Sequence, residues 1–302
     1  MYLAIYGIGK IITIAKYCQN RPLPLKSDHY SSPIDKSQRI SFTYDRNNRV
    51  GIFMANKDTT KQNMPLFYKD PQPLVAEKHK NLAVKENIGF LFAKDTNSIP
   101  VAINEFASLS KFYPLVFVDT EDGGLSLAIT GFREHENVFV NSDGKWVEGV
   151  PQPAYVHRYP FIFFEDAPSN KLILCIDMDS DFISEKEGIA LFKDGNPTEL
   201  AQNAMQACAD YHKFLLGTQA FIKALKEEDL LMPYRLEMKM GDEEINLAGF
   251  SIVDEKKFGQ LPADKLETWH KNGWLFFVHA HLISVSNISR IAQLTEKVKE
   301  AV

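Results

Sequence analysis

Two turn sequences, each flanked by short apolar runs, constrain the fold of this chain most strongly. They are Glu121-Asp122-Gly123-Gly124, between residues 115–118 and 125–129, and Ser142-Asp143-Gly144, between residues 138–140 and 146–147. Because Asp-Gly and Gly-Gly pairs supply the positive φ angles of tight hairpin turns, each pattern predicts two antiparallel strands. Further strands are predicted from aromatic and branched runs at residues 89–93, 155–164 and 172–176.

A long helix is predicted after these strands. Asn196 is a good N-cap residue, Pro197 suits the first helical position, and the side chain of Glu199 can reach back to the cap. Gly217 lies inside the helix and costs on the order of 1 kcal/mol relative to Ala, which indicates close packing or a break. Side chains at steps of three and four then predict one buried stripe. They are Leu200, Ala204, Ala207, Cys208, Tyr211, Leu215, Thr218, Ile222 and Leu225.

The remaining patterns complete the expected fold class, which is α+β. Residues 104–111 predict a helical turn, and residues 236–240 and 245–252 predict another hairpin. Helices are predicted at residues 264–270 and 287–299. We therefore expect an antiparallel, hairpin-rich first half that packs with a long capped helix and C-terminal helices.

The charge changes sign along the chain. Residues 1–63 contain ten Lys and Arg against four Asp, which gives +6 and leaves −11 for residues 64–302 to reach the total of −5. Residues 20–63 are polar and without periodicity, so we predict that residues 1–63 form a basic, poorly structured extension. Residues 64–302 are predicted to form a single domain that folds without it.

The first 15 residues leave three interpretations open. They are apolar except for Lys10 and Thr13, but no basic region precedes them and no small-residue cleavage site follows. They therefore make a poor secretory signal. An interfacial helix is one alternative, and a biological start at Met64 is the other. The absence of a leader predicts a cytoplasmic location.

Composition disfavours two further classes of protein. A net charge of −5 argues against a nonspecific grip on nucleic acid. The longest apolar runs, such as residues 274–278, fall far short of the roughly 20 residues of a spanning helix, so we expect no transmembrane segment. Cys18, Cys175 and Cys208 show no CxxC spacing, and we interpret Cys175 and Cys208 as buried apolar residues in a reducing compartment.

An ordered set of short motifs resembles the SapC family of bacterial proteins. The motifs are residues 104–106 (NEF), 113–117 (YPLVF), 137–140 (NVFV), 144–146 (GKW), 155–161 (YVHRYPF), 174–177 (LCID), 191–195 (LFKDG), 273–274 (GW) and 280–284 (AHLIS). Each motif is short, and the order of the set makes it specific over residues 64–302. The resemblance implies a link to the bacterial surface layer (S-layer) and supplies no catalytic residues.

Two patterns, one of histidines and one of aspartates, suggest metal ligands. His279 and His281 would share one face of a strand, where two imidazoles could hold an ion, but would diverge on a helix. His281 also matches the SapC pattern. Asp177-x-Asp179-x-Asp181 begins like a calcium loop, yet Phe182 stands where the loop needs Gly. A solvated acidic turn is therefore favoured, and a looser calcium site is the alternative, since calcium accepts flexible oxygen cages. We predict no metal and no cofactor.

Glu105, His157 and Arg158 are polar residues set among apolar neighbours. Glu105 could be a buried acid with a raised pKa. Arg158 could be its ion-pair partner, or its guanidinium could bind the carboxylate of a ligand through two hydrogen bonds. His157 and Arg158 would face opposite sides of a strand. Trp146 and Tyr159 are expected to be buried and structural. With Asp177 and His281, Glu105, His157 and Arg158 are the candidate binding residues.

Two functions of different class follow from these patterns. The first is a non-enzymatic binding or assembly factor with a protein partner related to the surface layer. The second is a metal-assisted or acid-base enzyme that uses Glu105, Asp177, His279 and His281. Because the sequence contains no G-x-S-x-G, Walker A, dinucleotide or H-E-x-x-H motif, the first function is favoured.

Overall fold

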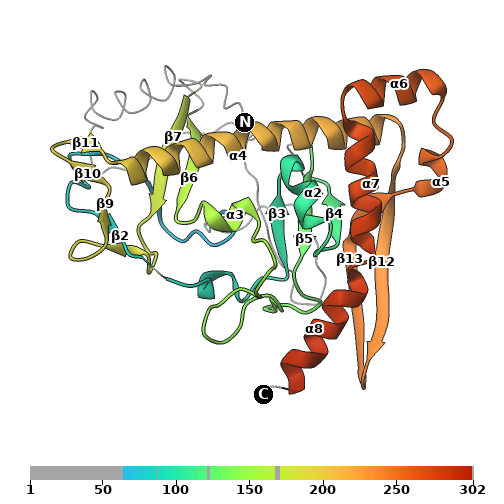
Figure 1. Cartoon of the computed structure of the whole chain (residues 1–302), viewed down its shortest axis with the longest axis horizontal. Helices are drawn as coiled ribbons and strands as arrows, with labels where there is room; N and C mark the ends of the chain where they lie inside the picture. The colour runs from blue at the N-terminus through green and yellow to red at the C-terminus, as the bar shows by residue number, and fades with distance from the viewer. Residues whose placement is uncertain (1–63, 87, 121–122, 167–170, 301–302) are drawn as a thin grey trace, which may run out of the picture. The chain divides into compact units, whose positions relative to one another are not determined.

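The computed structural model describes residues 64–86, 88–120, 123–166 and 171–300 (Figure 1). The described residues fall into two compact units, which we call unit 1 (Tyr68–Ile88 and Arg158–His212) and unit 2 (residues 64–67, Gly89–His157 and residues 213–300). Helices and antiparallel sheets occur together, which confirms the predicted α+β class. The predicted basic extension, residues 1–63, lies outside the described residues, as does Cys18.

Unit 1 contains three small antiparallel sheets. The first has the order β1 (Pro71–Pro73), β7 (Lys171–Asp177), β6 (Phe161–Asp166), and the second β8 (Ile183–Ser184), β2 (Ala83–Val84), β9 (Ile189–Ala190); β10 (Phe192–Lys193) and β11 (Asn196–Pro197) form the third. Their apolar faces share one core with the start of helix α4 (Glu199–Glu227). Its buried members are Leu74, Leu82, Phe161, Leu174, Ile176, Leu191, Ala201, Met205 and Cys208.

Unit 2 is built on one five-stranded antiparallel sheet. Its order is β12 (Leu231–Met240), β13 (Glu243–Val253), β4 (Leu115–Val118), β5 (Leu125–Ile129), β3 (Ser98–Val101). Figure 1 shows helix α7 (Trp274–Val285) running along β13, followed by α8 (Ile288–Glu300). The other helical elements are η1 (Leu91–Ala93), η2 (Ile103–Glu105), α2 (Phe106–Leu109), α3 (Ala154–His157), α5 (Glu255–Phe258) and α6 (Ala263–Lys271).

Aromatic side chains fill the space between the sheet and the helices of unit 2. Phe106, Phe117, Phe221 and Phe277 contact one another with ring centroids 5.8–6.4 Å apart. Trp269 of α6 packs on Phe221 at 6.4 Å. Such edge-to-face contacts add to the burial energy of each ring. They fix the position of α7 against the sheet.

Several predictions of strands and helices are confirmed. The runs at residues 115–118 and 125–129 are the antiparallel pair β4 and β5, although residues 121–122 of their turn are outside the described part. The predicted hairpin at residues 236–252 is β12 and β13, and the helices at residues 264–270 and 287–299 are α6 and α8. The predicted strands at residues 138–140 and 146–147 are wrong: on either side of Gly144, which has φ +75°, Val140 and Trp146 form only an isolated bridge.

Two further predicted strands are wrong. Residues 89–93 contain the 3-10 helix η1, and the Phe90 N–H donates to the Gly144 carbonyl at 2.6 Å. Residues 155–164 begin as the helical turn α3, and the strand β6 starts only at Phe161. Both runs are short and apolar, and apolar composition alone does not distinguish a strand from a short helix.

The long helix is confirmed, but its predicted start is wrong. Asn196 and Pro197 pair with β10 as strand β11, and α4 begins at Glu199. Thr198 precedes it, and its hydroxyl donates to the Ala190 carbonyl at 2.7 Å. Of the predicted stripe, Ala207 is exposed, whereas Cys208, Tyr211, Thr218, Ile222 and Leu225 are buried.

Gly217→Ala should stabilise the protein. The helix runs through Gly217 without a break, and a β-carbon there would lie 3.5 Å from the Ile103 side chain, an ordinary contact. Ala restricts the unfolded chain and favours the helix, so we expect the free energy of unfolding to rise by about 0.5–1 kcal/mol. Urea denaturation measures this change. A lower stability would show that the Ile103 contact does not tolerate a methyl group.

Candidate functional site

One face of helix α7 forms a row of hydrogen bonds to unit 2. His281 Nε2 accepts the Val253 N–H of β13 at 3.0 Å. Ser284 Oγ accepts the Leu115 N–H of β4 at 3.0 Å and donates to the His281 carbonyl at 2.6 Å. Asn287, just after α7, donates from Nδ2 to the Ser110 carbonyl at 2.7 Å. The three side chains attach α7 and the residue after it to β13, to β4 and to the end of α2.

His281 is fully buried and electrically neutral. Burial lowers its pKa to about 3, and its ring lies 4.8 Å from that of Phe117. Because Nε2 accepts a hydrogen bond, the proton of the neutral ring is on Nδ1. A hydrogen bond with the Leu115 backbone opposes the fall in the pKa of His281, but burial outweighs it. A neutral imidazole enclosed in this way supports packing and has no route to a solvent-exposed substrate.

His279 does not converge with His281. Both residues lie on helix α7, where positions two apart point to different sides. The His279 side chain is exposed and its ring contacts Phe258 edge-on at 5.5 Å. The idea that these two imidazoles share an ion is therefore wrong, because the segment is a helix. Across the described part of the chain, no group of three or more His, Cys, Asp and Glu side chains is placed to hold a metal.

Glu105 is a buried carboxylate that closes the turn of η2. Its Oε2 accepts the Ala102 N–H at 2.9 Å, and its Oε1 accepts the Ala154 N–H at 2.6 Å. Burial raises the pKa of Glu105, and the two backbone hydrogen bonds oppose that rise. Both oxygens therefore bond to the backbone, joining η2 to the start of α3.

Arg158 and His157 occupy different environments. The Arg158 guanidinium lies over the Tyr211 ring at 4.5 Å and near the Tyr68 ring at 5.9 Å. Such cation–π contacts stabilise the fold of unit 1. His157, the last residue of α3, is exposed overall, although its ring lies edge-on to Phe90 and partial burial lowers its pKa. The predicted strand arrangement of this pair is replaced by the α3 turn.

Asp177 is buried at the end of β7, where a solvated acidic turn was predicted. Its carboxylate accepts the Asp70 N–H at 2.7 Å, the Lys69 N–H at 3.2 Å and the Tyr159 hydroxyl at 3.1 Å. Asp179 is exposed, so the three aspartates do not form one cage. Asp177 therefore joins the segment just before β1 to the end of β7. Burial raises the pKa of Tyr159 to about 12, which keeps its hydroxyl a donor.

The buried cysteines of unit 1 match the expectation. Cys175 and Cys208 are buried, with 3% and 2% of their surface exposed. Burial raises the pKa of Cys208 to about 11. Because the thiolate is the reactive form, this thiol is inert at neutral pH.

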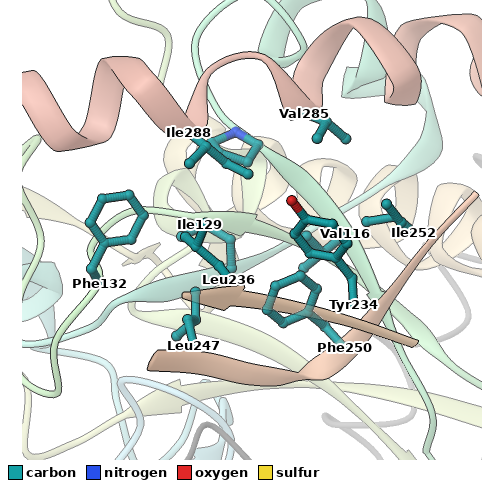
Figure 2. Close-up of a pocket in the computed structure, with 11 residues that line it drawn as sticks. Val116, Ile129, Phe132, Tyr234, Leu236, Leu247, Phe250, Ile252, Val285 and Ile288 are labelled. Carbon is teal, nitrogen blue, oxygen red and sulfur yellow. The ribbon is translucent and has the colours of Figure 1, made fainter. Parts of the chain in front are cut away.

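An apolar hollow lies between the sheet of unit 2 and the junction of α7 and α8. Figure 2 shows Val285 and Ile288 above it and the side chains of the hairpin β12–β13 below it. Its free volume is about 10 Å³, close to that of one water molecule. The Tyr234 hydroxyl is the one polar side-chain group of the lining. The lining residues are Pro114, Val116, Ile129, Phe132, Tyr234, Leu236, Leu247, Phe250, Ile252, Val285 and Ile288.

The residues that line the hollow fall into two groups by exposure, a half-buried group that we call the rim and a buried group. Tyr234, Leu236, Ile252, Val285 and Ile288 are half-buried, whereas the other lining residues are buried. The half-buried residues come from β12, β13 and the α7–α8 junction. The hollow is therefore open to solvent on the side bounded by these elements.

The comparisons assign the chain to a family. A model of the family described as SapC matches residues 74–291. The chain belongs to the SapC family. The matched stretch contains the whole lining of the hollow, as well as Glu105, Asp177 and His281. No curated protein and no solved structure gives a significant match.

One segment of this SapC family member meets the length and hydropathy of a membrane span. Residues Trp274–Glu296 have a mean hydropathy of 1.2 over an 18-residue window, 28% of which is buried. The stretch consists of two helices, α7 and α8, and α7 buries His281 and Ser284 against the sheet. Core helices of globular proteins pass the same test, so this segment is weak support for a membrane span.

Sequence reasoning missed the hollow and the roles of Ser284 and Asn287. A signal for these two was present, since His281, Ser284 and Asn287 recur at steps of three in an apolar segment, as one helix face requires. The hollow had no such signal. Its lining comes from residues 114–132 and 234–288, and only the tertiary structure brings these together.

Proposed function

We propose that this SapC family member is a non-enzymatic binding or assembly factor associated with the bacterial surface layer. We further propose that its apolar hollow receives an apolar side chain of a protein partner. The family resemblance supports the surface-layer association. The open, apolar rim of the hollow supports the binding role.

The size of the hollow favours a protein partner over an enclosed small molecule. Pockets that enclose drug-sized ligands have volumes of about 300–1,000 Å³, whereas the free volume here is about 10 Å³. An apolar side chain of the partner that packs against the half-buried rim residues removes their apolar surface from water. It does not need to enter the hollow deeply. Each Å² of apolar surface buried in this way contributes about 25 cal/mol.

The buried polar candidate residues make hydrogen bonds that stabilise the fold. Glu105 and His281 bond to backbone N–H groups of unit 2, and Asp177 does so in unit 1. For the enzyme alternative, these three and His279 would have to face one reacting group. His279 and His281 point to different sides of α7, which removes the pair on which the metal-assisted reaction depended.

Filling the hollow tests this function. Val285→Phe adds volume at the rim, and Ile283→Phe makes a similar change at a position on the same helix that is 63% exposed and outside the lining. The tagged full chain and both variants are used to capture proteins from a native lysate. We expect one partner to be retained by the wild type and by Ile283→Phe, and its yield to fall at least about tenfold with Val285→Phe. Equal capture by Val285→Phe would contradict the proposal.

A further inference from the structure

Strand β12 is a long edge of the unit 2 sheet. It spans Leu231–Met240, or about 33 Å at 3.3 Å per residue. In the part of the chain that the structure describes, β12 pairs only with β13. The other side of the strand therefore presents a row of backbone N–H and C=O groups. Such an edge is a template for another strand.

The side chains of β12 alternate between two faces. Arg235, Glu237 and Lys239 are exposed, whereas Tyr234 and Leu236 are half-buried and line the hollow. Arg235 and Glu237 are 59% and 64% exposed, and their charged groups lie 3.2 Å apart. Opposite charges thus stand on either side of Leu236 on the outward face.

This pattern is complementary to itself when the strand is reversed. We propose that two copies of the chain pair through β12, antiparallel and centred on Leu236, so that their sheets join into one. Residues 232–240 of each copy then lie opposite one another. Arg235 faces Glu237 of the second copy, and Glu237 faces Arg235 of the second copy. Directly opposed charges of opposite sign stabilise a pair of strands.

The apolar face is matched in the same register. Tyr234 lies opposite Met238 of the second copy, and Leu236 lies opposite Leu236. These contacts bury more of Tyr234 and Leu236, which are half-buried in the single chain. Pro233 lacks an N–H, but proline is accepted on edge strands, and it faces Lys239 of the second copy.

Neighbouring registers are less favourable. Centring the pair on Arg235 or on Glu237 places that residue opposite its own copy, so like charges meet. Centring it on Met238 pairs Glu237 with Lys239 but leaves only residues 236–240 of the strand opposite one another. A shift by one residue would place charged side chains on the apolar face. The charges therefore select the register centred on Leu236.

Charge exchange tests this interface. The mass of the full chain is measured by sedimentation over a concentration series, and a dimer has twice the chain mass of 34.3 kDa. Arg235→Glu and Glu237→Arg each turn two opposed ion pairs into two like-charged pairs. Each should raise the dissociation constant of the dimer by about tenfold or more. The double variant R235E/E237R restores complementarity and should return the constant close to the wild-type value.

Two controls define the result. Lys271→Glu reverses an exposed charge that also sits in an ion pair, but on α6, and should leave the constant unchanged. Thermal unfolding checks that every variant is folded. The proposal would be overturned if the wild type stays monomeric. It would also be overturned if neither single charge reversal changes the dissociation constant of the dimer.

A cysteine at the centre tests the register separately. Leu236→Cys places two thiols opposite each other, where cross-strand β-carbons are about 4.5–5.5 Å apart, near disulfide range. Mild oxidation should give a covalent dimer with Leu236→Cys and none with Arg235→Cys or the wild type. Equal cross-linking at both positions would exclude this register.

Discussion

Lowering the pH from 7.5 to 5 should destabilise the protein by about 2 kcal/mol through His281 alone. In the folded state burial holds the pKa of His281 at about 3, against 6.5 for an ordinary imidazole. Between these values the unfolded chain binds a proton that the folded chain does not. Stability is therefore fully present above pH 6.5 and falls as the pH drops toward 3, by about 5 kcal/mol in total.

The measurement is the free energy of unfolding in urea at pH 7.5 and at pH 5. His79 and His157 also have lowered pKa values, so the wild type is compared with His281→Gln. Glutamine does not titrate and keeps an acceptor for the Val253 N–H. We expect the variant to lose about 2 kcal/mol less than the wild type over this range. An identical pH dependence in both proteins would show that His281 is protonated while folded.

Trp146→Ala should cost about 3–5 kcal/mol of folding free energy. The Trp146 ring is 8% exposed, stacks on Phe139 at 6.4 Å and contacts Phe90 edge-on at 5.5 Å. Its Nε1–H donates to the Tyr113 hydroxyl at 3.1 Å, and that hydroxyl donates to the Pro151 carbonyl. Truncation leaves a cavity and removes the donor. The midpoint of urea unfolding should fall accordingly.

Trp146→Phe separates packing from the hydrogen bond. Phenylalanine keeps a six-membered ring but lacks the N–H and the second ring of the indole, so the cost should be smaller than that of Trp146→Ala, about 1–2 kcal/mol. The change in unfolding free energy of Cys208→Ala, a small truncation at a buried position in unit 1, serves as the reference for both Trp146 variants. A Trp146→Ala protein that keeps wild-type stability but no longer captures the partner would instead make Trp146 a binding residue.

Local patterns determined much of the secondary structure. The turn between residues 115–118 and 125–129 predicted β4 and β5, and the alternation around Leu236 and Met238 predicted β12. The stripe from Leu200 to Leu225 predicted α4. In each case the signal, either a turn sequence or a period of two or of three to four residues, lies in the segment itself, so neighbours along the chain carry the information.

Other segments depended on tertiary context. Residues 274–278 are apolar on every side, and such a run has no period to distinguish a strand from a helix. The structure makes it part of α7, and this separated His279 from His281. Likewise, α3 replaced a predicted strand at His157, where the Ala154 N–H bonds to Glu105, far away in sequence.

The sequence by itself determined the α+β class, the main hairpins, the long helix and the membership of the SapC family. The tertiary structure decided which polar side chains are buried, where the hollow lies and that β12 is an edge. Asp177 resembled part of an exposed acidic turn, yet the N–H groups of Lys69 and Asp70 enclose it. Burial and strand order depend on contacts between residues that are distant in the chain, and local periodicity does not predict these contacts.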